Sequence, residues 1–300
     1  MSTATKGCDE AAEALPWSNL IAEVDRALGA EIDARAFPRE LDDAIRYAVL
    51  GSGKRLRPIL VLLATEAVGG RLADALPPAV GIEMIHCFSL VHDDLPAMDD
   101  DDLRRGRPTL HRHAGEAMAI LAGDAMNTLA FEVVANRLSD DVAGPVGREL
   151  ATATGDMIAG QVLDTLGGFE EGLTDRQRLV TVHRHKTAAL FRASCRMGAI
   201  CGKADPDQLA ALTRYGEAIG LMFQAVDDLL DVTQTTEHLG KAVDKDAAQG
   251  KLTYPEVLGV ETTRSEIQRL HTAANEALAP CGGRGDALRD LCAYLAVRTR

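Results

Sequence analysis

Aromatic residues are scarce in this 300-residue sequence and occupy only 4% of its positions. Strands draw heavily on aromatic and β-branched side chains, so this scarcity argues against a β protein. Hydrophobic residues still make up 46% of the chain, which is enough to bury one large core. The composition therefore predicts an all-α fold.

Basic charge and long apolar runs are also lacking. The net charge is −13, and a field of that sign repels nucleic acid and anionic membrane surfaces. The longest strictly apolar runs, such as residues 59–64, are far shorter than the ~20 residues of a membrane span. No secretion signal opens the chain. We therefore expect a cytoplasmic protein with no membrane span and no nucleic-acid partner.

The six cysteines include no pair at CxxC spacing, and no HExxH pattern accompanies the histidines. Zinc sites need such clustered ligands, so a zinc protein is excluded. Several of the cysteines lie inside apolar helical runs. These are expected to be buried free thiols in a reducing compartment.

Apolar residues at helical spacing, with start and stop signals, predict a single domain of helices. Thr174 with Gln177, and Asp205 with Gln208, form capping-box patterns at helix starts. The long central helices are apolar on most faces and must be buried in a bundle. We expect a flexible N-terminus over residues 1–18 and one domain over 19–300. The predicted helices cover residues 41–49, 59–68, 79–95, 115–138, 174–202, 205–231, 264–279 and 285–297.

The first acidic cluster lies at the end of an apolar helix, where Asp93 and Asp94 are followed by Asp99. On an unbroken helix the residue one turn after Asp93 would be Ala97, which has no carboxylate. Pro96 breaks the helix, so the chain is predicted to bulge and to bring Asp99 back beside Asp93.

The second cluster, Asp227, Asp228 and Asp231, lies about 130 residues later. Asp227 and Asp231 project from one helical face, where like charges need a cation to offset their repulsion. All-oxygen ligands of this kind favour Mg²⁺. The alternative, a solvated charge run, fits Asp100, Asp101 and Asp102 better than the other aspartates.

Basic residues supply what an anionic ligand would need. Lys54, Arg55 and Arg57 lie in a glycine-rich loop that leads into a helix, and the spacing is not that of a Walker A loop. Arg104 and Arg105 follow the first acidic cluster. Lys186, Lys241 and Lys251 lie in the second half of the chain. Acidic and basic groups this close together indicate a metal–diphosphate site.

Six motifs in order resemble the trans-prenyl diphosphate synthases, particularly the bacterial farnesyl diphosphate synthases. They span about residues 41–300 and read GSGKRLRP, HDDLPAMDDDDLRRGRPT, GQVLD, HKT, FQAVDDLLD and GKLTYP. The resemblance implies a bundle of long antiparallel helices around a central cavity, with both aspartate clusters at its mouth. It also implies a homodimer.

The resemblance assigns roles to individual residues. Asp93, Asp99 and Asp227 would bind Mg²⁺, supported by Asp94, Asp228 and Asp231. Arg104, Lys186 and Lys241 would hold the allylic diphosphate, and Lys251 would also contact substrate. Lys54, Arg57, His86 and Arg105 would hold isopentenyl diphosphate. Thr187 and Gln224 would face the developing carbocation, and Arg298 to Arg300 would fold over the isopentenyl site.

The implied reaction is the Mg²⁺-dependent, head-to-tail condensation of isopentenyl diphosphate with dimethylallyl or geranyl diphosphate, releasing diphosphate. In the family, an aromatic at Phe88 together with the Pro96-Ala97 insertion implies a C15 product, farnesyl diphosphate. Helix geometry places Ser89 more nearly beneath Asp93. The alternatives are a geranylgeranyl diphosphate synthase, a terpene cyclase and a non-enzymatic helical scaffold.

Overall fold

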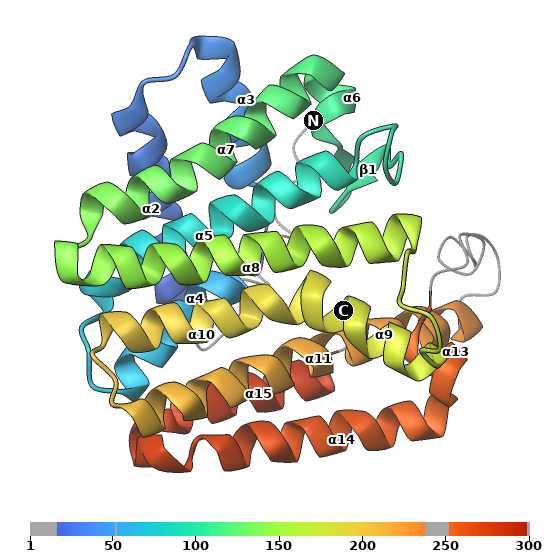
Figure 1. Ribbon diagram of the computed structural model, residues 1–300. Helices are drawn as coiled ribbons and strands as arrows, with labels where there is room; N and C mark the ends of the chain where they lie inside the picture. The colour runs from blue at the N-terminus through green and yellow to red at the C-terminus, as the bar shows by residue number, and fades with distance from the viewer. Residues whose placement is uncertain (1–16, 52, 238–251, 299–300) are drawn as a thin grey trace. The chain divides into compact units, whose positions relative to one another are not determined.

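The computed structural model of the chain describes residues 17–51, 53–237 and 252–298 (Figure 1). Residues 1–16, Lys241, Lys251 and the last two residues lie outside these ranges. Ser18 begins a helix and Trp17 is buried. Residues 17 and 18 therefore belong to the folded part of the chain, which differs from the expected boundary at residue 18.

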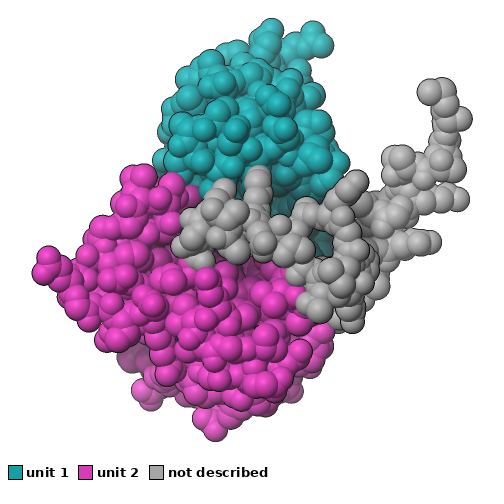
Figure 2. Space-filling model, turned by 90° about the vertical axis from the view of Figure 1, so that its right-hand side faces the viewer, with its two compact units in different colours: residues 1–62, 72–147 teal, residues 63–71, 148–300 magenta. Residues whose placement is uncertain are grey.

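The chain divides into two compact units, and the single domain over residues 19–300 stays a prediction. Unit 1 comprises residues 1–62 and 72–147, and unit 2 comprises residues 63–71 and 148–300 (Figure 2). Of the three boundaries, two fall within helices α4 (Leu56–Ala67) and α8 (Asp140–Leu166), and the third lies just before residue 72.

Unit 1 is built around α5, which packs against α7, α2 and α3. Helix α2 presents Ile21, Val24, Leu28 and Ile32 as a buried stripe at the three- and four-residue spacing of one helical face. Besides the first parts of α4 and α8, the elements of this unit are α2 (Ser18–Arg35), α3 (Arg39–Val49), α5 (Leu72–Asp93), β1 (Leu103–Arg104), β2 (Arg107–Pro108), α6 (Leu110–Ala114) and α7 (Glu116–Arg137).

Helix α7 is the one described helix with the length and hydropathy of a membrane span. Its most apolar 18-residue window is 44% buried, and it packs against α5, α3 and α6 within unit 1. Core helices of globular proteins meet the same criteria, and these contacts identify α7 as a packing helix of its unit.

Unit 2 is built around α11, which packs against α10, α14 and α15; Figure 1 shows α11 running between α10 and α14. The buried Tyr215 hydroxyl of α11 donates to the Leu288 carbonyl of α15 at 2.6 Å. Besides the second parts of α4 and α8, the elements are α9 (Asp175–His183), η1 (Arg184–Ala188), α10 (Ala189–Cys201), α11 (Pro206–Glu237), α13 (Tyr254–Leu258), α14 (Val260–Ala277), η2 (Ala279–Gly285) and α15 (Asp286–Val297).

The all-α prediction is confirmed, and so are both capping boxes. The Thr174 and Gln177 side chains each bond the other residue's backbone N–H, and Asp205 and Gln208 do the same. Some predicted helix starts are wrong. The helix predicted from residue 264 begins at Val260. The Pro77-Pro78 pair was expected to open a helix, but α5 begins earlier, at Leu72. The two prolines lie in its second turn, where they remove only two intrahelical hydrogen bonds.

Candidate active site

The first aspartate motif has the predicted bulge. Helix α5 ends at Asp93, and the Asp99 N–H donates to the Asp93 carbonyl oxygen at 2.9 Å. A turn around Pro96 separates the two residues, and both side chains are half-buried. The chain therefore returns Asp99 to the helix end, as the break at Pro96 requires.

Asp94 turns inward from this bulge and pairs with Arg104. Arg104 Nε lies 2.8 and 2.9 Å from the two Asp94 oxygens, and its Nη2 donates to Oδ1 at 2.6 Å. Burial raises the pKa of Asp94, and the Arg104 guanidinium offsets part of that rise. Because a guanidinium has five N–H donors, Arg104 keeps donors for an anionic ligand after binding Asp94.

A two-stranded hairpin, which the sequence did not predict, presents Arg105. Arg104 pairs with Arg107 across the hairpin, so Arg105 and Gly106 form its two-residue turn. Their φ angles of +51° and +75° are those of a type I′ turn. The Tyr47 hydroxyl donates to the Pro108 carbonyl at 2.8 Å and fastens the hairpin to α3.

Basic groups converge on His86, which is half-buried on α5. Burial lowers the pKa of His86 well below its usual value, and the charges of Arg57, Arg105, Arg104 and Arg55 lower it further. His86 is therefore neutral near pH 7, beside several guanidinium groups. Unit 1 thus brings together the predicted isopentenyl ligands Arg57, His86 and Arg105.

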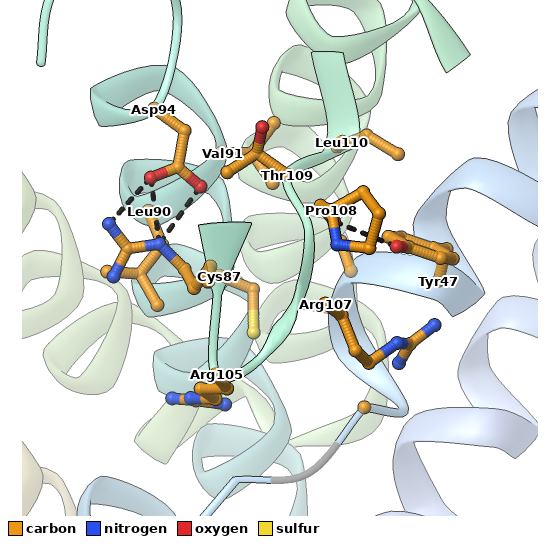
Figure 3. Close-up of a pocket in the computed structure, with 13 residues that line it drawn as sticks. Tyr47, Cys87, Leu90, Val91, Asp94, Arg105, Arg107, Pro108, Thr109 and Leu110 are labelled. Carbon is orange, nitrogen blue, oxygen red and sulfur yellow. Dashed lines mark hydrogen bonds and ion pairs between the residues drawn. The ribbon is translucent and has the colours of Figure 1, made fainter. Parts of the chain in front are cut away.

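A pocket in unit 1 lies beneath the hairpin (Figure 3). It encloses roughly 530 Å³ of empty space, part of it open to solvent. In Figure 3, Asp94 lies at one end of the view and Arg105 at the other. The predicted site residues in its lining are Asp94, Arg104 and Arg105, whereas Lys54, Arg57 and His86 do not line it.

The second aspartate motif lies on the unbroken helix α11. Asp227 is half-buried and Asp231 exposed, whereas Asp228 is only 6% exposed. Gln224 Nε2 donates to Asp228 Oδ1 at 2.7 Å, and the Tyr254 N–H donates to Oδ2 at 2.9 Å. Burial raises the pKa of Asp228 to about 7, against these two hydrogen bonds.

Thr187 and Gln224, which the resemblance places together, are hydrogen-bonded to each other. The Thr187 hydroxyl donates to Gln224 Oε1 at 3.1 Å. Thr187 lies in η1, a π-helical segment that follows α9. The same segment carries Lys186, whose Nζ lies 2.5 Å from Asp164 of α8. A Cβ at Gly160 of α8 would lie 2.2 Å from the backbone nitrogen of Lys186, so only glycine lets α8 approach the backbone of η1 this closely.

His183 is a buried residue beside this site that the sequence analysis did not select. Its ring stacks on Tyr254 with centroids 5.3 Å apart, and its Nε2 lies 3.7 Å from Asp228. Burial lowers the pKa of His183 to about 4, so the ring is neutral near pH 7 and its contact with Asp228 is not an ion pair. Its sequence signal was its position three residues before Lys186.

Arg298 contacts the second aspartate motif. Its Nη2 lies 2.5 Å from Asp227 Oδ1 and donates to the Phe223 carbonyl at 3.0 Å. Its guanidinium carbon lies 3.9 Å from the centroid of the Phe223 ring. Arg298 therefore packs on α11 of unit 2, and the expected fold of residues 298–300 over the isopentenyl site stays a prediction.

The two residues predicted to set product length lie on α5. Phe88 is 7% exposed and meets the His92 ring edge-on, with centroids 5.6 Å apart. His92 in turn lies 3.2 Å from the Ile120 carbonyl of α7. Phe88 is thus part of the α5 surface that carries His92, whereas the half-buried Ser89 bonds the His86 carbonyl.

Among residues 17–51, 53–237 and 252–298, no three or more His, Cys, Asp or Glu side chains are grouped as a metal site. The predicted substrate ligands Lys241 and Lys251 lie outside these ranges.

An all-α chain with two aspartate motifs and a cluster of guanidinium groups belongs to the class of helical prenyltransferases.

Comparisons with known proteins identify the family. The sequence profile described as "Polyprenyl synthetase" matches residues 38–279, so the chain belongs to that family of trans-prenyl diphosphate synthases. It is 44% identical over 263 residues to the large subunit 1 of a heterodimeric geranylgeranyl pyrophosphate synthase from Arabidopsis thaliana, covering 85% of this chain and 71% of the relative. Geranylgeranyl pyrophosphate synthase from Catharanthus roseus is also 44% identical, with 81% and 69% covered.

Solved structures agree with the fold. An FPP/GFPP synthase from Zymomonas mobilis has a TM-score of 0.82 and 34% identity, covering 97% of this chain and 99% of the other. Geranylgeranyl pyrophosphate synthetase from Pyrococcus horikoshii has a TM-score of 0.82 and 31% identity, covering 95% and 100%. Family membership argues against the cyclase and scaffold alternatives.

Proposed function

We propose that this prenyltransferase condenses isopentenyl diphosphate head to tail with allylic diphosphates in an Mg²⁺-dependent reaction that releases diphosphate. The observation that carries the proposal is the bulge at Pro96, which holds Asp99 against Asp93 at a helix end. Asp227 of the second motif completes the proposed ligand set. Hard carboxylate oxygens at half-buried positions suit Mg²⁺, which keeps several waters and binds substrate phosphates.

The metal and the side chains have separate tasks. When bound, Mg²⁺ draws negative charge from the allylic diphosphate and makes it a better leaving group. Arg104 and Lys186 would hold that diphosphate. Arg57, Arg105 and the neutral His86 would hold the diphosphate of the isopentenyl substrate. No side-chain nucleophile takes part, because the attacking group is the double bond of isopentenyl diphosphate.

Thr187 and Gln224 would stabilise the allylic cation. The Gln224 carbonyl oxygen accepts from Thr187 while its amide donates to Asp228, so the amide orientation is fixed from both ends. A carbonyl oxygen has two lone pairs, and the second one is available to face positive charge. The proton lost after condensation would go to the departed diphosphate.

We propose geranylgeranyl diphosphate, the C20 compound, as the main product. The support is that the two relatives described above, each 44% identical to this chain, are named geranylgeranyl pyrophosphate synthases. The sequence instead predicted C15, which the family resemblance implies from the aromatic ring at Phe88 together with the Pro96-Ala97 insertion. That ring is engaged with His92 on α5, which favours a role in helix packing over one in limiting product length.

Product sizing tests this choice directly. Purified protein given labelled isopentenyl diphosphate and dimethylallyl, geranyl or farnesyl diphosphate should form mainly C20 product, and the Phe88→Ala variant should give the same size. Mainly C15 product, lengthened in Phe88→Ala, would restore the farnesyl alternative. Absence of condensation product with any starter, or full activity in excess EDTA, would overturn the proposed reaction itself.

The proposal includes a cytoplasmic homodimer. The resemblance to the family supports the dimer, and the composition supports the compartment. Light scattering should give about twice the 32.0 kDa mass of the chain. A monomeric mass at micromolar concentration would contradict the dimer. Recovery of the protein in the membrane fraction of expressing cells would contradict the cytoplasmic location.

A further inference from the structure

Arg55 lies in the middle of the basic loop, the name used here for residues 53–57, whose last two residues begin α4, and its side chain is buried in unit 1. The side chain of its neighbour Lys54 is exposed and that of Arg57 is half-buried. Arg55 by contrast is only 2% exposed. The sequence grouped these three residues as one cluster of phosphate ligands, and the structure separates Arg55 from the other two.

The Arg55 guanidinium joins four segments of unit 1. Its Nε donates to Asp25 Oδ1 of α2 at 2.7 Å, and its Nη1 donates to Glu83 Oε1 of α5 at 2.8 Å. Its Nη2 donates to the carbonyl oxygens of Val49, at the end of α3, and of Gly51, at 2.6 and 3.2 Å. Every nitrogen of the guanidinium therefore has a protein acceptor.

The charge of Arg55 is secured by its partners. Burial alone would lower its pKa, but the Glu83 carboxylate and, less strongly, Asp25 raise the pKa above the usual guanidinium value. A buried cation with two carboxylates and two carbonyls around it is satisfied from within the protein. Such a group fastens structure and has little left to offer a ligand.

The backbone of the loop depends on this fastening. Arg55 has φ +51°, a left-handed conformation that a residue with a side chain adopts only when its surroundings enforce it. Arg105, at the hairpin turn, has the same φ. A Cβ at Gly53 would lie 2.8 Å from Arg55 Nη1 and 2.7 Å from Arg105 Nη1. The missing side chain of Gly53 thus lets both guanidinium groups lie against the loop.

We propose that Arg55 is a positioning residue, which holds the basic loop so that Lys54 and Arg57 face the diphosphate of isopentenyl diphosphate. Arg55 itself does not touch the substrate. This inference rests on the proposed function, which gives Lys54 and Arg57 to that substrate. It adds Asp25 and Glu83, two carboxylates that the sequence pattern did not single out, to the residues that determine its binding.

The test loosens the fastening while keeping Arg55 in place. Asp25 is partly exposed, so Asp25→Asn removes one carboxylate with little risk to folding; Glu83→Gln removes the buried one. We expect each to raise KM for isopentenyl diphosphate about tenfold, the scale of a displaced binding group. The KM for the allylic diphosphate and kcat should stay within about twofold.

Asp33→Asn is the matched control. Asp33 also lies on α2 and is one of two carboxylate partners of an arginine, Arg46, whose other partner is Asp42. Its partner Arg46 lies on α3 and not in the basic loop, so the kinetic constants of Asp33→Asn should equal those of the unmodified protein. Gly53→Ala is a second variant that pushes Arg55 and Arg105 without changing charge, and it should also raise KM for isopentenyl diphosphate.

Calorimetric binding of isopentenyl diphosphate distinguishes a failure of the proposed function from a failure of the proposed role of Arg55. Failure of the unmodified protein to bind or condense it would overturn the proposed function. Unchanged affinity in Asp25→Asn and Gly53→Ala, with the unmodified protein active, would overturn the role of Arg55 alone. Tighter binding in Asp25→Asn would make Arg55 a direct ligand, and equal rises in both KM values would indicate general loosening; either result contradicts the inference.

Discussion

In both aspartate motifs the first residue of the Asp–Asp pair is half-buried and the second is buried, yet the buried residues have different partners. Asp94 receives its hydrogen bonds from the charged side chain of Arg104. Asp228 receives them from two neutral donors, the Gln224 amide and the Tyr254 N–H. The first motif lies in unit 1 and the second in unit 2.

The comparison separates two tasks within each pair. Asp94 fastens the Arg104–Arg107 hairpin to the end of α5, and Asp228 fastens the start of α13 to α11. The inner aspartates, Asp94 and Asp228, therefore act through the segments that they hold. The half-buried members, Asp93 and Asp227, remain the proposed metal ligands, and the resemblance gives Asp94 and Asp228 to their support.

The largest expected effect is loss of catalysis on substitution of the outer aspartates, Asp93 and Asp227. Asp93→Asn and Asp227→Asn should each lower kcat at least ~10²-fold, because each removes a proposed ligand of the charge-withdrawing metal. Steady-state rates at saturating substrate and Mg²⁺ measure this loss. The free energy of unfolding of Asp93→Asn should change by less than about 1 kcal/mol, since Asp93 is not in the buried position of its pair. That of Asp227→Asn should fall further, because the buried Arg298 guanidinium loses its carboxylate partner.

A conserved rate in either outer variant would break the division of tasks. So would an unfolding free energy that falls as far in Asp93→Asn as in Asp94→Asn. Asp102→Asn is the matched control, because Asp102 is an exposed aspartate that pairs with Arg112 after the same motif. It should leave both the rate and the stability unchanged.

The inner aspartates should differ in stability. Asp94→Asn leaves the Arg104 charge without its carboxylate and should cost about 2 kcal/mol, a value reduced because Arg104 is partly exposed. Asp228→Asn should cost less than about 1 kcal/mol. The hydrogen bonds that link residue 228, Gln224 and Thr187 involve only neutral partners in this variant, so their donors and acceptors can exchange roles. The new amide at position 228 then donates to the Gln224 carbonyl, and the Gln224 amide donates to the Thr187 hydroxyl.

Urea unfolding of the two variants measures this difference. An equal loss of stability in both, or a larger loss in Asp228→Asn, would show that the charge of Arg104 is not what distinguishes the motifs. Arg104→Lys sharpens the result. It keeps the charge but loses the two-nitrogen contact with Asp94, so its stability should fall between those of the unmodified protein and Asp94→Asn.

Much of the fold was predictable because caps and apolar spacing are local signals. The Thr174 and Asp205 capping boxes gave correct helix starts for α9 and α11. Helix α8 was missed because it contains Pro145 and several glycines, which argue against a helix when read locally. One of them, Gly160, is there because Lys186 approaches it, and that contact is visible only in the folded chain.

The candidate site, like the fold, has some features that the sequence predicts and others that it does not. The bulge at Pro96 was predictable because proline breaks a helix regardless of its surroundings. The inward turn of Arg55 was not, since its partners Asp25 and Glu83 lie 30 and 28 residues away in the sequence. The hairpin escaped notice because its strands have two residues each, too few for any alternating pattern to appear.

The smallest expected effect concerns Arg298, which contacts Asp227 in unit 2. A guanidinium on this carboxylate competes with a divalent cation for the same oxygens. Arg298→Gln should therefore lower the Mg²⁺ concentration for half-maximal activity about two- to fivefold, the scale of one partly exposed ion pair. Titration of activity with Mg²⁺ measures the change, with Arg269→Gln as control because Arg269 pairs with Glu266 on α14. A higher Mg²⁺ requirement would mean that Arg298 orients Asp227 for the metal, and Asp227 would then depend on a charged partner much as Asp94 does.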